Sequence, residues 1–236
     1  MNDNPPQIGI GFFAAVMASI SHELKNRIAI MMEHAGLLQD YSEMAIEGRE
    51  INMERLGRLG IALSEEVIKA DEILKNMNKM AHSVDDIFRT SDINEVLRLS
   101  TALAERTANQ HRVNLQFLPS ESSISVTTVT FFLINLIWLC LTAFFQIGDK
   151  ARTVAISAEQ LKGQKFQIRM RLEGSDLNSE ANFTAPSGLS LLTDALGADV
   201  EWNKVDSELL IHLPIDLSNR GRSDELAAMI TSSNMG

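Results

Sequence analysis

Three residues near the start of the chain, His22, Glu23 and Asn26, have the types and the spacing that phosphoryl chemistry needs. They lie in a long stretch compatible with a helix, where residues four apart share one face. The imidazole can act as a nucleophile toward a phosphoryl group. The carboxylate can take a proton from it or hold its tautomer, and the amide can orient a water or a phosphoryl oxygen. The alternative is a histidine that is merely solvated on a helix surface.

The segment from Ser21 to Ile28 reads Ser-His-Glu-Leu-Lys-Asn-Arg-Ile. It resembles the H-box of sensor histidine kinases, whose phosphoacceptor segment reads Ser-His-Glu-Leu-(Lys/Arg)-(Asn/Thr)-Pro-Leu. The resemblance implies that His22 is the phosphoacceptor, that Glu23 is its acidic partner, and that Asn26 positions water for dephosphorylating a receiver. Arg27 replaces the usual proline, so we expect a straighter helix there. Lys25 could offset phosphoryl charge, although an exposed lysine is more often simply solvated.

The composition limits the classes of function that the chain can have. Its 236 residues are 45% hydrophobic and 22% charged, as expected for a globular protein with a real core. The net charge of −10 argues against nonspecific nucleic-acid binding and gives no sign of attraction to anionic lipid. The single cysteine, Cys140, excludes an intrachain disulfide and suits a reducing cytoplasm. Residues 1–8 carry no basic segment of a signal peptide. We therefore expect a cytoplasmic location and no membrane contact.

Apolar periodicity predicts two long helices, at about 12–41 and 51–88, after a short loose tail at residues 2–6. The segment 42–49 is long enough to reverse the chain, so residues 9–90 form an antiparallel helical hairpin. Such a hairpin cannot bury two continuous apolar stripes alone. Pairing of two copies into a four-helix bundle buries both, and we expect this homodimer; the alternative is packing against the rest of the same chain.

A receiver must then dock on the outside of the bundle, beside His22. Asn26, Ile30 and Glu33 step by four and three down one face of the first helix. Ile30 is apolar and lies off the core series of Leu24, Ile28 and Met31. We therefore expect Lys25, Ile30 and Glu33 to contact the partner. Residues 66–71 of the second helix should lie at matching height.

Residues 91–216 read as an α+β sandwich, and residues 217–236 as a polar tail with a weak helix at 224–230. The run at 128–146 is too short and too interrupted for a membrane span, so we expect a buried helix. The other expected elements are a helix at 92–109 capped by Asp92, strands at 111–118, 123–127, 153–158 and 165–172, a helix at 187–195 closed by Gly197, and a hairpin at 200–205 and 208–214.

This order of elements resembles the ATP-binding domain of histidine kinases, but the nucleotide motifs are eroded. In the segment Asn135–Cys140, Leu139 replaces the asparagine that reaches Mg²⁺ in the family, and leucine cannot ligate a hard cation. The glycine boxes are reduced to Glu173–Leu177 and Ser187–Leu191. An intact phosphoacceptor beside an eroded ATP site resembles the dimeric histidine phosphotransferases of bacterial phosphorelays. We therefore expect no cofactor and no metal of the chain's own, with Mg²⁺ supplied by the receiver.

Two other functions remain open from the sequence. The first is a sensor histidine kinase with a divergent nucleotide site, which nucleotide binding would reveal. The second is a non-catalytic scaffold or inhibitor that docks on a kinase or a receiver through the bundle. The latter predicts that His22→Ala leaves partner binding and output unchanged.

Overall fold

The computed structural model describes residues 5–147, 152–173 and 183–218. The chain divides into two compact units. One is Met17–Asn78, and the other combines the residues up to Val16 with those from Lys79 onward. The predicted helix at 224–230 and most of the first glycine-box segment lie outside the described residues.

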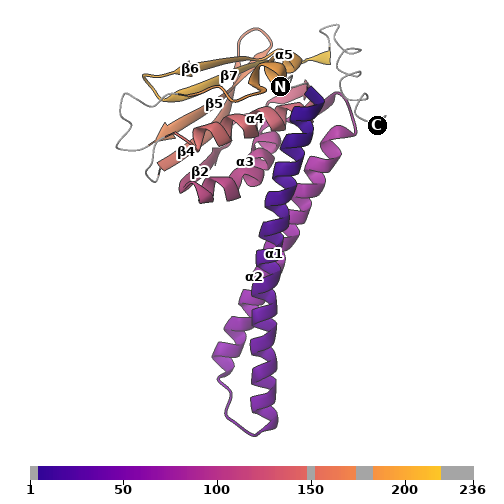
Figure 1. Cartoon of the computed structure of the whole chain (residues 1–236), viewed down its shortest axis with the longest axis vertical. Coiled ribbons are helices and arrows are strands. Elements are labelled where there is room, and N and C mark those ends of the chain that lie inside the picture. Colours follow the sequence, from indigo (N-terminus) through magenta and orange to yellow (C-terminus); the bar gives the residue numbers. More distant parts are fainter. Residues whose placement is uncertain (1–4, 148–151, 174–182, 219–236) are drawn as a thin grey trace. The chain divides into compact units, whose positions relative to one another are not determined.

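Two long helices, α1 (Pro5–Ile46) and α2 (Met53–Ala81), form the predicted antiparallel hairpin (Figure 1). α1 is continuous through Arg27, as expected once proline is absent there. It also begins earlier than predicted, because Pro5 and Pro6 belong to its first turn and not to a loose tail. Proline is tolerated in the first turn, where a missing N–H breaks no helical hydrogen bond.

The chain reverses between these helices through Gly48, whose φ of 75° favours glycine. Asn52 then caps α2, its side-chain oxygen accepting a hydrogen bond of 2.9 Å from the backbone N–H of Arg55. The prediction that the second helix continues to Phe88 is wrong. α2 ends at Ala81 and is followed by a 3₁₀ turn at His82–Val84, where the Ser83 hydroxyl donates to the Met80 carbonyl at 2.6 Å.

The hairpin buries only part of its apolar surface. Leu59 and Ala70 are buried on α2, whereas Val67 is 51% exposed and Leu74 is 39% exposed, although all four belong to the apolar repeat of this helix. On α1 the side chain of Ile28 is 46% exposed. A single hairpin therefore leaves apolar side chains on both helices in contact with solvent.

The other unit is built on a five-stranded sheet with the order β2-β4-β5-β7-β6. β2 and β4 are parallel, and the remaining pairs are antiparallel. Together with three helices this makes the predicted α+β fold. The bounds are β2 Val113–Leu118, β4 Arg152–Leu161, β5 Lys165–Glu173, β6 Asp199–Asn203, β7 Glu208–Pro214, α3 Ile93–Gln110, α4 Thr130–Phe144 and α5 Leu189–Leu196.

Figure 1 shows α3, α4 and α5 on one side of this sheet. The strand residues that alternate toward that side are buried and apolar, including Ile156, Ile168 and Ile211. α4 is the predicted buried helix: Leu133, Ile137 and other apolar residues on it have no exposed surface. Within the described part of the chain, no helix is both long enough and apolar enough to span a membrane.

The structure also contains a strand that the sequence did not suggest. It lies at the boundary between the hairpin expected at 9–90 and the sandwich expected at 91–216, where β1 (Arg89–Asp92) pairs antiparallel with β3 (Ser125–Thr128). The helix cap predicted at Asp92 is confirmed, because its carboxylate accepts a hydrogen bond of 2.8 Å from the N–H of Asn94. Gly197, with φ of 58°, closes α5 as predicted.

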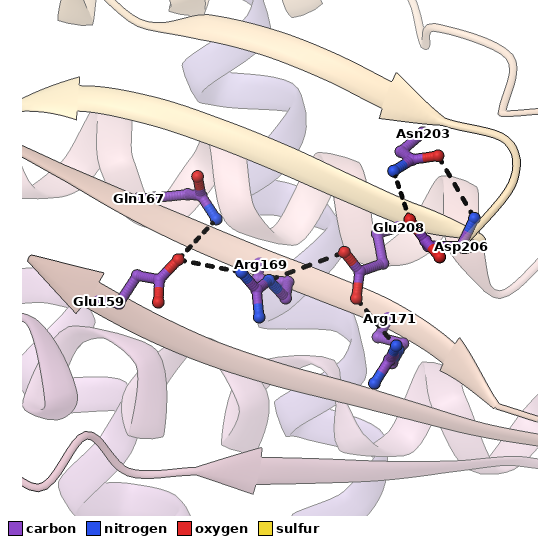
Figure 2. A network of polar contacts seen from close by, with 7 residues as sticks. All are labelled: Glu159, Gln167, Arg169, Arg171, Asn203, Asp206 and Glu208. Carbon is purple, nitrogen blue, oxygen red and sulfur yellow. Dashed lines mark hydrogen bonds and ion pairs between the residues drawn. The ribbon is translucent and has the colours of Figure 1, made fainter. Parts of the chain in front are cut away.

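The opposite face of the sheet is polar, and its side chains join neighbouring strands (Figure 2). Nη2 of Arg169 on β5 lies 3.0 Å from Oε1 of Glu159 on β4, and its Nε lies 3.7 Å from Oε2 of Glu208 on β7. Arg171 adds a contact of 3.0 Å to Glu208. Alternating charges of this kind suit a solvated sheet face, and we attribute no binding function to it.

Candidate functional site

His22 lies on α1 with its side chain exposed to solvent. In the part of the chain that the structure describes, no hydrogen bond or ion pair engages its imidazole. A nucleophile must present an unoccupied lone pair to the group it attacks, so an exposed imidazole without a partner meets the first requirement of a phosphoacceptor.

Lys25 and Asn26 follow His22 by three and four residues on the same helix, and both are exposed. Helix geometry therefore places an ammonium group and an amide on the face that His22 occupies. Glu33, eleven residues from His22, is also exposed. These residues share one accessible face, as the sequence indicated.

Ile30 lies differently from the expectation. It is half-buried, whereas Ile28, which was expected in the core, is 46% exposed. Within one hairpin, therefore, Ile30 belongs more to the packed side and Ile28 more to the open side. The proposed part of Ile30 in partner binding stays a prediction.

Glu23 belongs to a network of charges that the sequence did not reveal. Its carboxylate Oε1 lies 3.7 Å from Nη2 of Arg27, one turn further along α1. Nη1 of the same guanidinium donates a hydrogen bond of 3.1 Å to Oε2 of Glu66 on α2. The other oxygen of Glu66 accepts a hydrogen bond of 2.7 Å from Nζ of Lys69. Arg27 therefore connects the acidic neighbour of His22 to the second helix of the hairpin.

Glu66 is the buried end of this network, with only 10% of its side chain exposed. Hydrogen bonds from Lys69 and Arg27 lower its pKa below the ordinary value of 4.5, against the opposing effect of burial. The carboxylate therefore stays ionised at neutral pH. A buried anion held by two cations is a firm attachment point for the guanidinium.

Sequence reasoning missed the roles of Arg27 and Glu66, although two signals pointed to them. Arg27 stands four residues after Glu23, the spacing of an ion pair on a helix. Glu66 belongs to the part of α2 expected at matching height, and the hydrogen bond to Arg27 confirms that register.

Two of the eroded nucleotide motifs lie on α4 and at the start of α5, whereas most of the first glycine-box segment lies outside the described residues. Asn135 is 1% exposed, and neither atom of its side-chain amide has a hydrogen-bond partner within the described residues. Leu139 follows one turn later and is half-buried. Gly188, with φ of 86°, precedes α5. Among the described residues no group of three or more His, Cys, Asp or Glu side chains could hold a metal. The absence of a cofactor stays a prediction.

Comparison with known proteins gives results for structure only. No family model matches the sequence, and no curated protein matches it. Solved structures that resemble the chain include several histidine kinases. The catalytic domain of histidine kinase ThkA matches with a TM-score of 0.45 and 14% identity, over 55% of this chain and 97% of that chain.

Two further matches extend over more of this chain. The Acinetobacter baumannii histidine kinase AdeS has a TM-score of 0.43 and 16% identity, over 84% of this chain and 98% of its own. Histidine kinase ThkA, solved in complex with the response regulator protein TrrA, has a TM-score of 0.44 and 15% identity, over 92% of this chain and 66% of its own. At these scores the resemblance transfers no activity or partner to this chain.

Proposed function

We propose that the chain is a histidine phosphotransferase of a two-component phosphorelay, which passes phosphoryl groups between His22 and response-regulator aspartates without ATP. The observation that carries the proposal is the exposed imidazole of His22, which no hydrogen bond or ion pair engages within the described residues, with Lys25 and Asn26 on its face and the Glu23 carboxylate next in the chain. The network through Arg27 to Glu66 supports it, since a pre-organised site needs fixed neighbours.

In the proposed transfer, the lone pair of the His22 imidazole attacks the phosphorus of a receiver's aspartyl phosphate. A P–N bond forms as the P–O bond breaks, and the receiver's aspartate leaves as a carboxylate. The imidazolium gives its remaining proton to Glu23 or to solvent, and the reverse sequence returns the phosphoryl group. Such transfer depends chiefly on positioning and on charge stabilisation, to which Lys25 and the receiver's Mg²⁺ contribute. Asn26 would orient the water that dephosphorylates a receiver.

We also propose that the working form is a cytoplasmic homodimer. The single hairpin leaves Ile28, Ile61, Val67 and Ile68 between 46% and 62% exposed. Apolar side chains on both helices would be covered if two hairpins joined in a four-helix bundle. His22 would remain accessible on the outside of that bundle.

An ATP-dependent sensor kinase is the second candidate. The solved structures named above are histidine kinases, and among the described residues the buried amide of Asn135 has no hydrogen-bond partner. However, the TM-scores are too low to transfer the activity, and Leu139 offers no oxygen to Mg²⁺. A non-catalytic scaffold is the third candidate, with the docking face in place and no chemistry at His22.

One pair of incubations separates these functions. Purified protein is mixed with radiolabelled ATP and Mg²⁺ alone, or with candidate receivers already phosphorylated and freed of nucleotide. The phosphotransferase acquires label only in the second incubation. Label acquired from ATP alone identifies a kinase, and absence of label in both, with a receiver still bound, identifies a scaffold.

A further inference from the structure

We propose that Arg27 is a positioning residue of the phosphotransfer site, which holds Glu23 beside His22 by tying it to Glu66 on α2. This inference rests on the proposed function, because it assigns a task to a residue that supports the phosphoacceptor. Arg27 itself is not placed in contact with a reacting group.

The geometry at Arg27 is that of one guanidinium shared by two carboxylates. Nη2 lies 3.7 Å from Oε1 of Glu23, and Nη1 donates to Oε2 of Glu66 at 3.1 Å. The Arg27 side chain is 29% exposed, so the two contacts are only partly screened by solvent. A planar guanidinium can donate a hydrogen bond to one carboxylate while its other amino group forms an ion pair with a second, which a lysine ammonium on a flexible stem does less well.

The far end of this connection is fixed. The Glu66 side chain is 10% exposed, and Lys69 occupies its second oxygen at 2.7 Å. Both oxygens of the anchor are therefore engaged, and the carboxylate remains charged because its pKa is lowered. Arg27 is thus bound to a rigid point on the neighbouring helix and not to a mobile surface group.

The near end needs this support. The Glu23 side chain is 33% exposed and would otherwise sample many rotamers in solvent. In the proposed mechanism its carboxylate must be available to the imidazole of the preceding residue, and a fixed counter-ion narrows its orientations. Without Arg27, the Glu23 carboxylate is still present but seldom has the orientation that the reaction needs.

The test is a double-mutant cycle on the rate of labelling from a phosphorylated receiver, with the full-length protein. Arg27→Gln should slow labelling about tenfold at saturating receiver, a loss of the size seen when a supporting residue is removed. Arg27→Lys should be intermediate. In the Glu23→Gln background, Arg27→Gln should slow labelling no further, because no carboxylate remains to be positioned.

Arg58→Gln is the matched control, since Arg58 makes an exposed ion pair with Glu54 on α2 four residues away along the same helix. It should label at the wild-type rate. Thermal unfolding followed by circular dichroism checks that each variant folds. If the Arg27→Gln protein does not fold, Arg27→Lys replaces it in the double-mutant cycle.

The outcomes separate this inference from the proposed function. Wild-type protein that acquires no label would refute phosphotransfer itself. Wild-type protein that is labelled, together with Arg27→Gln labelled as fast or faster, would overturn the positioning role alone. The positioning role would also be overturned if Arg27→Gln slowed labelling of the Glu23→Gln protein as much as it slows labelling of wild type. That result would show that Arg27 acts without Glu23.

Discussion

Arg27 and Glu66 lie 39 residues apart in sequence and join the two helices of the hairpin through a hydrogen bond of 3.1 Å between Nη1 and Oε2. In the segment that resembles the H-box of histidine kinases, Arg27 takes the place of the usual proline. The substitution has two consequences in this chain. α1 continues without a break, and Glu23, one turn before Arg27, forms an ion pair with a guanidinium that also binds the second helix.

The first prediction concerns the dependence of stability on pH. The pKa of Glu66 is lower in the folded chain than its ordinary value of 4.5, so its contribution to stability is present above that value and is lost as the pH falls through the lowered pKa. The melting temperature of wild type should therefore fall toward that of Glu66→Gln as the pH drops from about 6 to about 3. Parallel curves for the two proteins would show that Glu66 is not held by Arg27 and Lys69.

The second prediction concerns Cys140. Its side chain is fully buried, and burial raises the pKa of the thiol to about 12. The native protein should therefore react with a thiol reagent at pH 8 only as fast as it opens, whereas the denatured protein should react at once. Rapid modification of native protein, with circular dichroism unchanged, would mean that α4 is not packed as described.

The third prediction concerns the dimer. Val67→Glu places a charge on a side chain that is 51% exposed in the single hairpin but would be buried in the bundle. Burying a valine side chain stabilises the dimer by about 1.5–3 kcal/mol, and burying a charge opposes association. The variant should therefore be monomeric when its mass is measured by light scattering. Val205→Glu is the control, because Val205 is 92% exposed in the turn between β6 and β7. A Val67→Glu protein that remains dimeric would place the subunit contact elsewhere.

The fourth prediction concerns the docking face. Ile30→Glu should leave the protein dimeric while blocking transfer to and from receivers, because it would add a charge at the edge of the exposed face that carries Asn26 and Glu33. Since Ile30 is half-buried, Ile30→Ala serves as a companion that removes bulk without adding charge. It should retain more transfer than Ile30→Glu does. Monomeric or aggregated Ile30→Glu protein would assign Ile30 to the packing of the bundle.

Features governed by local chemistry were predictable from the sequence. The cap at Asp92, the helix end at Gly197 and the alternation of β5 follow from a few neighbouring residues. Features governed by distant residues were not. β1 has the sequence Arg-Thr-Ser-Asp, with no apolar alternation, and it becomes a strand because β3 pairs with it. The apolar repeat of the second helix continues to Val84 and Phe88, but α2 itself ends at Ala81.

The candidate site shows the same division. The grouping of His22, Glu23 and Asn26 could be read from their spacing, because one helix positions all three. The contact from Arg27 to Glu66 was missed despite its two sequence signals, because the half-buried side of α1 carries Glu23, Arg27 and His34 as well as Ile30. A search for apolar stripes overlooks a packed side that includes charges. In the single hairpin Ile30 is half-buried and Ile28 is 46% exposed, and the expected place of Ile28 in the core of the dimeric bundle stays a prediction.

The most direct test of the central claim measures acid-labile phosphate on this chain after incubation with a phosphorylated receiver and Mg²⁺, without ATP. Wild type should be labelled, and His22→Gln should not, with its circular dichroism and dimeric mass unchanged because His22 is exposed. His82→Gln is the matched control: its side chain is 70% exposed, and the variant should be labelled like wild type. Label on His22→Gln equal to that on wild type would contradict the assignment of His22 as the phosphoacceptor.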